Sequence, residues 1–211
     1  MTSVNLTRTE AVERSRMIEV GHYDVTLDLK YSDTHFLSTT KVSFTSREIG
    51  STFIDLRAEE IQEVRLNGNP LPTNSYNPTY GIPLSGLQVA DYTLEVTAKI
   101  PYSRTGEGLH RFVDPADDKI YLYTQFETAD AKRVFACFDQ PDLKATYSMD
   151  VTAPGAWTVV SNSEAAVSDV APTDGEVAPL DEEGGHALQR EVAEDADAVD
   201  PAADDQDLDP G

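Results

Sequence analysis

The sequence of 211 residues has one cysteine, Cys137, so no disulfide can form within the chain. It has no run that approaches the roughly 18 apolar residues of a membrane-spanning helix. Its first ten residues lack the apolar core of a secretory signal. Neither a glycine-rich phosphate loop nor a cluster of lysine and arginine occurs. These absences predict a cytoplasmic protein that has no contact with a membrane and does not bind nucleic acid.

Histidine is also scarce, and its positions do not suggest a metal site. The four histidines are His22, His35, His110 and His186, and none is followed by glutamate or by a second histidine four positions later. A tetrahedral zinc site needs ligands that converge. We place His22 and His35 on or beside strands, His110 in a glycine-containing turn and His186 in an acidic tail. The sequence therefore predicts no metal ligand and no catalytic residue in this chain.

The net charge of −22 is concentrated at the C-terminal end. Residues 164–211 contain sixteen acidic residues and one basic residue, Arg190, and no aromatic residue follows Trp157. Such a segment cannot bury enough apolar surface to offset its ordering entropy. We therefore expect a folded domain over residues 1–163 and a disordered acidic tail over residues 164–211. The tail is either an acidic interaction arm or a segment without an evolved role.

Period-two alternation of apolar and polar residues predicts β-strands across the first 163 residues. It is clearest at 23–31 and 92–100, and Asn67-Gly68 is a strong hairpin signal. Thr7 and Glu10 form a capping box that predicts a short amphipathic helix ending near Ile18. The spacing of strands and turns favours an all-β fold, a twisted antiparallel β-sandwich with one short N-terminal helix.

Residues 120–127 place a carboxylate and an amide at a strand end. Apolar residues alternate there with Tyr121, Tyr123, Gln125 and Glu127, so Gln125 and Glu127 share one face. The following run, 129–139, predicts about two turns of helix that end before proline. A carboxylate held at a rigid strand end can bind an ammonium group through a charge-assisted hydrogen bond.

The simpler alternative for Glu127 is a surface ion pair with Lys132 or Arg133. Pairs of this kind are common and contribute only about 0–1 kcal/mol. The residues alone leave both interpretations open.

Five separated segments resemble, in the same order, the N-terminal domain of the M1 zinc aminopeptidases, the aminopeptidase N family. They are 6–11, 23–29, 108–114, 121–147 and 157–163. The resemblance covers residues 1 to about 163 and implies the β-rich fold of that domain. It also implies that Glu127 would bind the free α-amino group of a peptide, and that Gln125 would line the pocket for the first side chain.

The catalytic motifs of that family are missing from the sequence. Full-length members use zinc held by a His-Glu-x-x-His motif and a distant glutamate, and a Gly-x-Met-Glu-Asn segment binds substrate. This chain has neither motif, so we expect it to be inactive alone. The resemblance implies a catalytic segment that is missing or separately encoded, as in a truncated or frame-shifted gene product. The other hypothesis is a free-standing β-sandwich that binds a peptide or protein through an open sheet edge.

Overall fold

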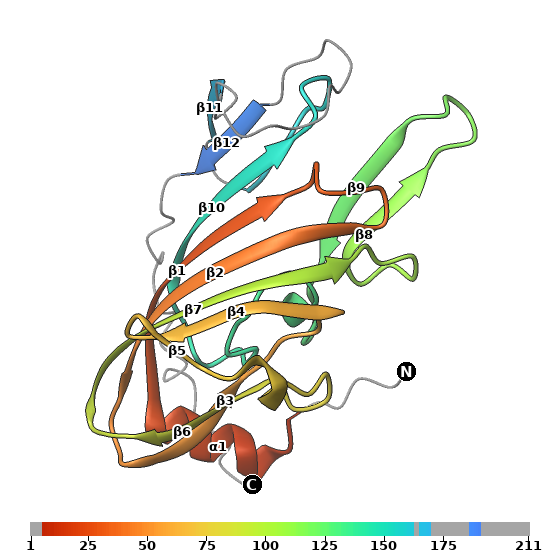
Figure 1. Cartoon of the computed structure of the whole chain (residues 1–211). Coiled ribbons are helices and arrows are strands. Elements are labelled where there is room, and N and C mark those ends of the chain that lie inside the picture. The colour runs from red at the N-terminus through yellow and green to blue at the C-terminus, as the bar shows by residue number, and fades with distance from the viewer. Residues whose placement is uncertain (1–5, 163–164, 170–185, 191–211) are drawn as a thin grey trace, which may run out of the picture.

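The computed structural model describes residues 6–162, 165–169 and 186–190. Within these residues there are one α-helix and twelve strands, and the strands form one large sheet and two small ones (Figure 1). The helix is α1 (Arg8–Met17), and two short 3-10 helices are η1 (Thr73–Ser75) and η2 (Ala131–Arg133). The all-β class with a short N-terminal helix is therefore confirmed.

The large sheet has eight strands in the order β11-β12-β10-β1-β2-β7-β4-β5. Its strands are β1 (Ile18–Asp28), β2 (His35–Ser46), β4 (Glu60–Leu66), β5 (Asn69–Pro70), β7 (Ala90–Pro101), β10 (Thr146–Ala153), β11 (Ala165–Asp169) and β12 (His186–Arg190). All of its pairs are antiparallel except β1 with β10. Parallel neighbours need a long connection, and the chain between these two strands includes eight other strands.

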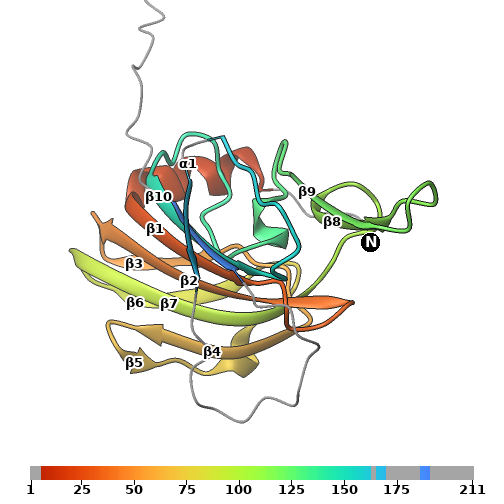
Figure 2. The same ribbon diagram turned by 90° about the horizontal axis from the view of Figure 1, so that it is seen from above.

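Each small sheet is a pair of antiparallel strands. β3 (Gly50–Ile54) pairs with β6 (Ile82–Leu87), and β8 (Gly108–Val113) pairs with β9 (Ile120–Gln125). In both views the hairpin β8–β9 projects beyond the large sheet (Figures 1 and 2).

The core forms where the apolar faces of these sheets meet. Along β1, Val25 and Leu27 are buried and Thr26 between them is exposed, as the alternation in the sequence predicted. Phe36 of β2 and Ile54 of β3 belong to the same buried cluster, which joins the large sheet to the pair β3–β6. The predicted turn at Asn67-Gly68 is present between β4 and β5, with both residues at positive φ.

Helix α1 begins as predicted, but it is not amphipathic. Its buried residues are Arg14 and Met17, whereas Val12 is 61% exposed. The Arg14 guanidinium donates to Asp55 (Nη1 to Oδ2, 2.6 Å) and to Gln140 (Nε to Oε1, 3.0 Å). A buried ion pair therefore attaches the helix, where the sequence pattern suggested an apolar stripe.

The capping box at the start of α1 supports a stability prediction. The Thr7 hydroxyl accepts from the Glu10 backbone N–H, and the Glu10 carboxylate accepts from the Thr7 backbone N–H at 2.8 Å. Thr7→Ala removes one of these contacts, so we expect a loss of about 1 kcal/mol in the free energy of unfolding. Glu13→Ala, at an exposed position of the same helix, is the control and should change it by less than about 0.5 kcal/mol. Equal denaturation midpoints for the two variants would contradict the assignment.

Two segments of the expected disordered tail, 165–169 and 186–190, are strands in the structure. Strand β12 pairs with β10, and β11 pairs with β12. Composition gave no indication of these two pairings, and the disordered tail expected over residues 164–211 stays a prediction. Residues 163–164, 170–185 and 191–211, on which the rest of that expectation falls, lie outside the described residues.

Candidate functional site at the end of hairpin β8–β9

Gln125 and Glu127 lie where the hairpin returns to the body of the domain. Gln125 is the last residue of β9 and pairs with Gly108 of β8. Glu127 follows two residues later, and both side chains are exposed. Between them Phe126 is half-buried, with its ring edge-on to Phe135 at a centroid distance of 6.1 Å. Exposure along β9 is interrupted in its alternation at Thr124, which is exposed as Tyr123 and Gln125 are, and alternation resumes at Phe126.

The segment after Glu127 is a tight turn followed by η2. The Asp130 N–H donates to the Phe126 carbonyl at 3.0 Å, which closes the turn. The predicted two-turn helix over 129–139 is wrong, since only 131–133 are helical. Cys137 instead exchanges two backbone hydrogen bonds with Asp55, at 2.9 and 3.1 Å. This pairing uses backbone groups that a longer helix would need.

Arg133 fastens the base of the hairpin to η2. The Arg133 Nε donates to Asp130 Oδ1. The Arg133 Nη2 lies 3.4 Å from Oε1 of Glu107, the residue directly before β8. Gly108 adopts φ +67° against this side chain, and a Cβ there would lie 2.7 Å from the Arg133 Cβ. The strand end that carries Gln125 is thus held in place by the contacts of Arg133 with Asp130 and with Glu107.

Replacing Gly108 should loosen this junction. Gly108→Ala combines an unfavourable positive φ with a close contact, so we expect a loss of about 1–3 kcal/mol. Gly68→Ala is a matched control, because Gly68 has φ +76° and no heavy atom within 4 Å of a Cβ built there. Urea unfolding of both variants measures the cost of the close contact as the difference. If both lose the same amount, Arg133 does not constrain the hairpin base.

Ionisation of the Glu107 carboxylate makes the stability of this hairpin base depend on pH. Hydrogen bonding from Thr105 chiefly lowers the pKa of Glu107 from 4.5, with a backbone hydrogen bond and the charge of Arg133 acting in the same direction. A lowered folded-state pKa stabilises the fold above the ordinary value, and this contribution is lost as pH falls through the lowered pKa. We therefore expect Glu107→Gln to reduce the melting temperature at neutral pH, with the difference from the unmodified chain shrinking below about pH 4. A difference that does not depend on pH would contradict this account.

Glu127 does not form the surface ion pair with Lys132 or Arg133 that the simpler alternative required. Across residues 6–162, the structure contains no ion pair or hydrogen bond between Glu127 and Lys132 or Arg133. Arg133 is engaged by Asp130 and Glu107, and Lys132 is buried with 6% exposure. The surface ion pair of the alternative interpretation is therefore not formed. An exposed carboxylate at a fixed strand end can accept hydrogen bonds from an incoming cation.

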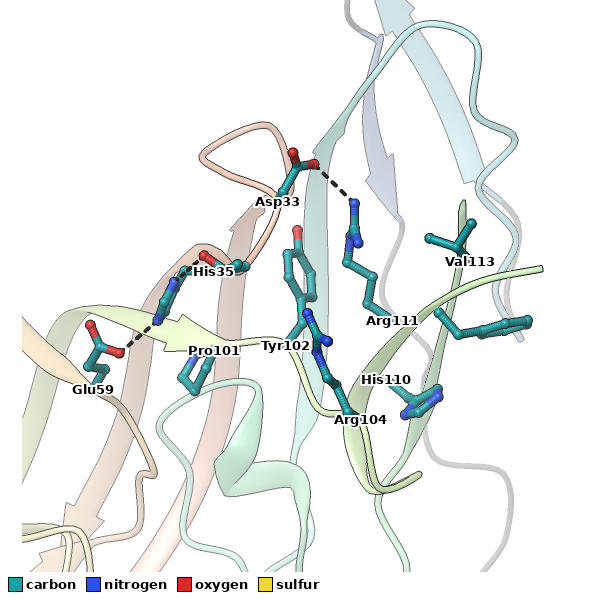
Figure 3. A pocket seen from close by; sticks show the side chains of 11 residues that line it. Asp33, His35, Glu59, Pro101, Tyr102, Arg104, His110, Arg111 and Val113 are labelled. Carbon is teal, nitrogen blue, oxygen red and sulfur yellow. Dashed lines mark hydrogen bonds and ion pairs between the residues drawn. The ribbon is translucent and has the colours of Figure 1, made fainter. Parts of the chain in front are cut away.

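A surface pocket of about 680 Å³ lies between residues 110–113 of β8 and residues 33–35 and 101–104 (Figure 3). Its lining includes Arg111, which pairs with Asp33 at 3.0 Å, and His35, which pairs with Glu59 at 2.8 Å. Gln125 and Glu127 do not line it. Asp33 and Arg111 form one ion pair and Glu59 forms another with Lys99, so Arg104 is the charged lining residue without an ion-pair partner among the described residues.

The histidines of the described residues do not converge. His22 contacts Thr146 at 2.7 Å, His35 contacts Glu59, and the His110 ring accepts from the Gly106 N–H at 3.1 Å. His110 lies within β8, so its predicted place in a turn is wrong. In the parts of the chain that the structure describes, no three His, Cys, Asp or Glu side chains are placed to hold a metal ion. The residues described here do not fit a zinc centre.

Sequence alternation gave no indication of two features that shape this site. Arg14 is one of several charged residues in helix α1, and its buried contacts are with residues 41 and 126 positions away. The second feature is the pairing of the His110 and Phe112 rings of β8 with the Tyr123 and Tyr121 rings of β9, where the sequence predicted a turn at His110. The alternating Tyr121 and Tyr123 were the available signal for the second feature.

Comparison with known proteins shows the class of this β-rich domain. The family model that matches is the Peptidase M1 N-terminal domain, over residues 20–177. The chain belongs to this family. The match extends past residue 163, where we expected the domain to end, and includes β11.

Known proteins of this family align with most of the chain. The chain is 49% identical over 166 residues to aminopeptidase N of Streptomyces lividans, covering 77% of this chain and 19% of that protein. It is 27% identical over 165 residues to a probable M1 family aminopeptidase of Encephalitozoon cuniculi, covering 73% and 18%. The chain thus spans about a fifth of the length of these relatives.

A solved structure shares the fold. The crystal structure of Legionella pneumophila aminopeptidase A in complex with aspartic acid matches 82% of this chain and 19% of that chain, with a TM-score of 0.59 and 21% identity. The M1 aminopeptidase family is generally zinc-dependent. Over the described residues, no helix has the length and apolar content required to cross a bilayer.

Proposed function

We propose that this chain is the substrate-anchoring part of a zinc-dependent aminopeptidase that removes N-terminal residues from peptides. Glu127 binds the free α-amino group of the peptide, and Gln125 lines the pocket for its first side chain. The observation that carries the proposal is the exposed Glu127 carboxylate, which no described lysine or arginine neutralises, beside a strand end fixed by Arg133.

The chemistry of this anchor follows from charge and position. A peptide ammonium donates to the carboxylate through a charge-assisted hydrogen bond, which is about twice as strong as a neutral one. The anchor fixes how far the peptide enters the site, so that one residue lies beyond the bond to be cleaved. A blocked N-terminus lacks the charge and does not satisfy Glu127.

Catalysis belongs to a segment outside this chain. In the full-length enzyme the zinc ion would polarise the scissile carbonyl and activate water. The sequence has no His-Glu-x-x-His motif, so its residues bind and orient the peptide, in a protein of the cytoplasm.

The alternative is a free-standing β-sandwich that binds a peptide or protein through an open sheet edge. Strand β12 pairs along β10 over residues 150–153, so the edges of the large sheet are β11 and β5. No observation on the described residues favours this second function.

The isolated chain provides the test. We expect the purified 211-residue protein to contain no stoichiometric zinc and to release no product from aminoacyl-anilides, with or without added zinc. Chelator-sensitive hydrolysis that co-purifies with the chain would show that it holds its own metal centre and would overturn this division of roles.

A further inference from the structure

The pocket in Figure 3 contains two guanidinium groups with donors to spare. Arg104 lies in the connection between β7 and β8 and is exposed, and no described residue forms an ion pair or a hydrogen bond with it. Arg111 of β8 has one such partner among the described residues, the Asp33 carboxylate, at 3.0 Å from Nη2 to Oδ1. Each guanidinium has five N–H donors, so this single contact leaves most of them available to a ligand.

The wall of the pocket holds the Arg111 side chain in position. Only 14% of this side chain is exposed, and its Cζ lies 5.9 Å from the centroid of the Tyr102 ring. The Tyr102 hydroxyl donates to the Leu29 carbonyl at 3.2 Å, which fixes the ring. A guanidinium that is packed on a ring loses little freedom when it binds, and its planar fork matches a carboxylate. Arg104 extends toward the same ring (Figure 3).

The present partner of Arg111 is an exchangeable one. The Asp33 side chain is 92% exposed and belongs to the connection between β1 and β2. An ion pair with so exposed a partner contributes little to stability, because water competes for the carboxylate. Asp33 also shows which chemical group this guanidinium accepts. A carboxylate from solution can therefore take its place at little cost.

The rest of the lining selects the remainder of the ligand. Pro101, Phe112 and Val113 provide apolar surface, and the latter two are 39% and 51% exposed. A volume of about 680 Å³ falls in the range of sites for small organic molecules. The carboxylates of Asp33 and Glu59 also line the pocket, and they repel a second negative charge on a ligand. These features favour an organic monoanion over inorganic phosphate.

We propose that this pocket binds a small organic carboxylate with an apolar body. The carboxylate replaces Asp33 at Arg111 and accepts further hydrogen bonds from Arg104. The apolar body lies against Phe112 and Val113. This binding site is additional to the peptide anchor of the proposed function, and neither depends on the other.

Calorimetric titration of the 211-residue chain with hexanoate tests the proposal. Hexanamide is the uncharged analogue, and inorganic phosphate at a pH where it is a dianion is the second comparison. We expect one hexanoate per chain, bound at least about tenfold more tightly than hexanamide, because the guanidinium groups form charge-assisted hydrogen bonds with the acid. Phosphate should bind more weakly than hexanoate.

Three substitutions at exposed positions locate the binding. Arg104→Gln should weaken hexanoate binding by about tenfold, since it removes one of the two cations. Arg8→Gln changes an exposed arginine of α1 outside the pocket and should leave the affinity within about twofold. Asp33→Asn removes the competing carboxylate, so it should tighten binding by at least about threefold. A damaged fold does not produce such a gain in affinity.

Several results would overturn the proposal. Equal affinities for hexanoate and hexanamide, or no saturable binding of hexanoate, would mean that the pocket does not recognise a carboxylate. Unchanged affinity in Arg104→Gln would place the ligand elsewhere on the chain. Weaker binding in Asp33→Asn would show that Asp33 supports the ligand instead of competing with it. Tighter binding of phosphate than of hexanoate would assign the pocket to a different class of anion.

Discussion

In a chimera in which this chain replaces the matched fifth of Streptomyces lividans aminopeptidase N, Glu127→Gln is expected to lower kcat/KM for free-amine peptides by about 10- to 100-fold. Replacing the carboxylate with an amide turns a charge-assisted hydrogen bond into a neutral one, and bonds to charged groups contribute about 1.5–3 kcal/mol. The substitution preserves size, and the exposed position makes a folding defect unexpected. Hydrolysis of aminoacyl-anilides at several concentrations measures both kcat and KM.

Glu107→Gln is the matched control for that experiment. Glu107 lies at the other strand of the same hairpin base and pairs with Arg133, so it shares the region without facing the substrate in our account. We expect its kcat/KM to stay within about threefold of the unmodified chimera, a difference of less than 1 kcal/mol. Equal losses in the two variants would mean that Glu127 acts through the structure of the hairpin rather than through the peptide amine.

Arg14→Met should give the largest loss of stability in the described domain. Asp55 is 8% exposed, and it accepts from Arg14 and from the Asp139 N–H at 3.1 Å. Removing the guanidinium leaves a buried carboxylate without its counter-ion, which costs about 3–5 kcal/mol. For a domain of this size, that corresponds to a decrease in melting temperature on the order of 10 °C.

Two further variants make the ion-pair prediction specific. Arg47→Met breaks the exposed pair of Arg47 with Glu19 and should cost no more than about 1 kcal/mol. Arg14→Met combined with Asp55→Leu removes both buried charges, so it should recover much of the loss. If Arg14→Met destabilises no more than Arg47→Met, the pair does not hold α1 to the domain.

Local patterns predicted the elements of this fold whose stability is decided locally. The alternation along β1 places Val25 and Leu27 in the core, and the Thr7–Glu10 box starts α1 where expected. The turn at Asn67-Gly68 follows from the ease with which these residues adopt positive φ. In each case, residues within a few positions of one another determine the conformation.

The helix predicted over 129–139 was wrong, because the conformation of this segment depends on a distant partner. Residues 134–139 have a composition compatible with helix, but Cys137 pairs with the backbone of Asp55, far away in the sequence. Residues 186–190 lie in an acidic segment, yet they pair with β10. Neither pairing leaves a periodic trace in its own segment, so a single sequence does not reveal it.

At the candidate site, too, local features were predicted from the sequence and features that depend on tertiary packing were not. Alternation placed Gln125 and Glu127 at an exposed strand end, and the structure has them there. That Lys132 is buried and Arg133 is occupied by Asp130 and Glu107 depends on tertiary packing. The role of Glu127 in binding an amine stays a prediction, which the kinetics must test.

The most direct test combines a charge change in the ligand with one in the protein. Inhibition constants would be measured in the chimera for leucine amide and for its analogue without the amino group, with Glu127 and with the Glu127→Gln substitution. We predict that the amino group improves binding at least about tenfold when Glu127 is present, and that the substitution removes most of this preference, a coupling on the order of 1.4 kcal/mol or more. A preference for the amine that is equally large in both proteins would contradict the assignment of Glu127 as the anchor.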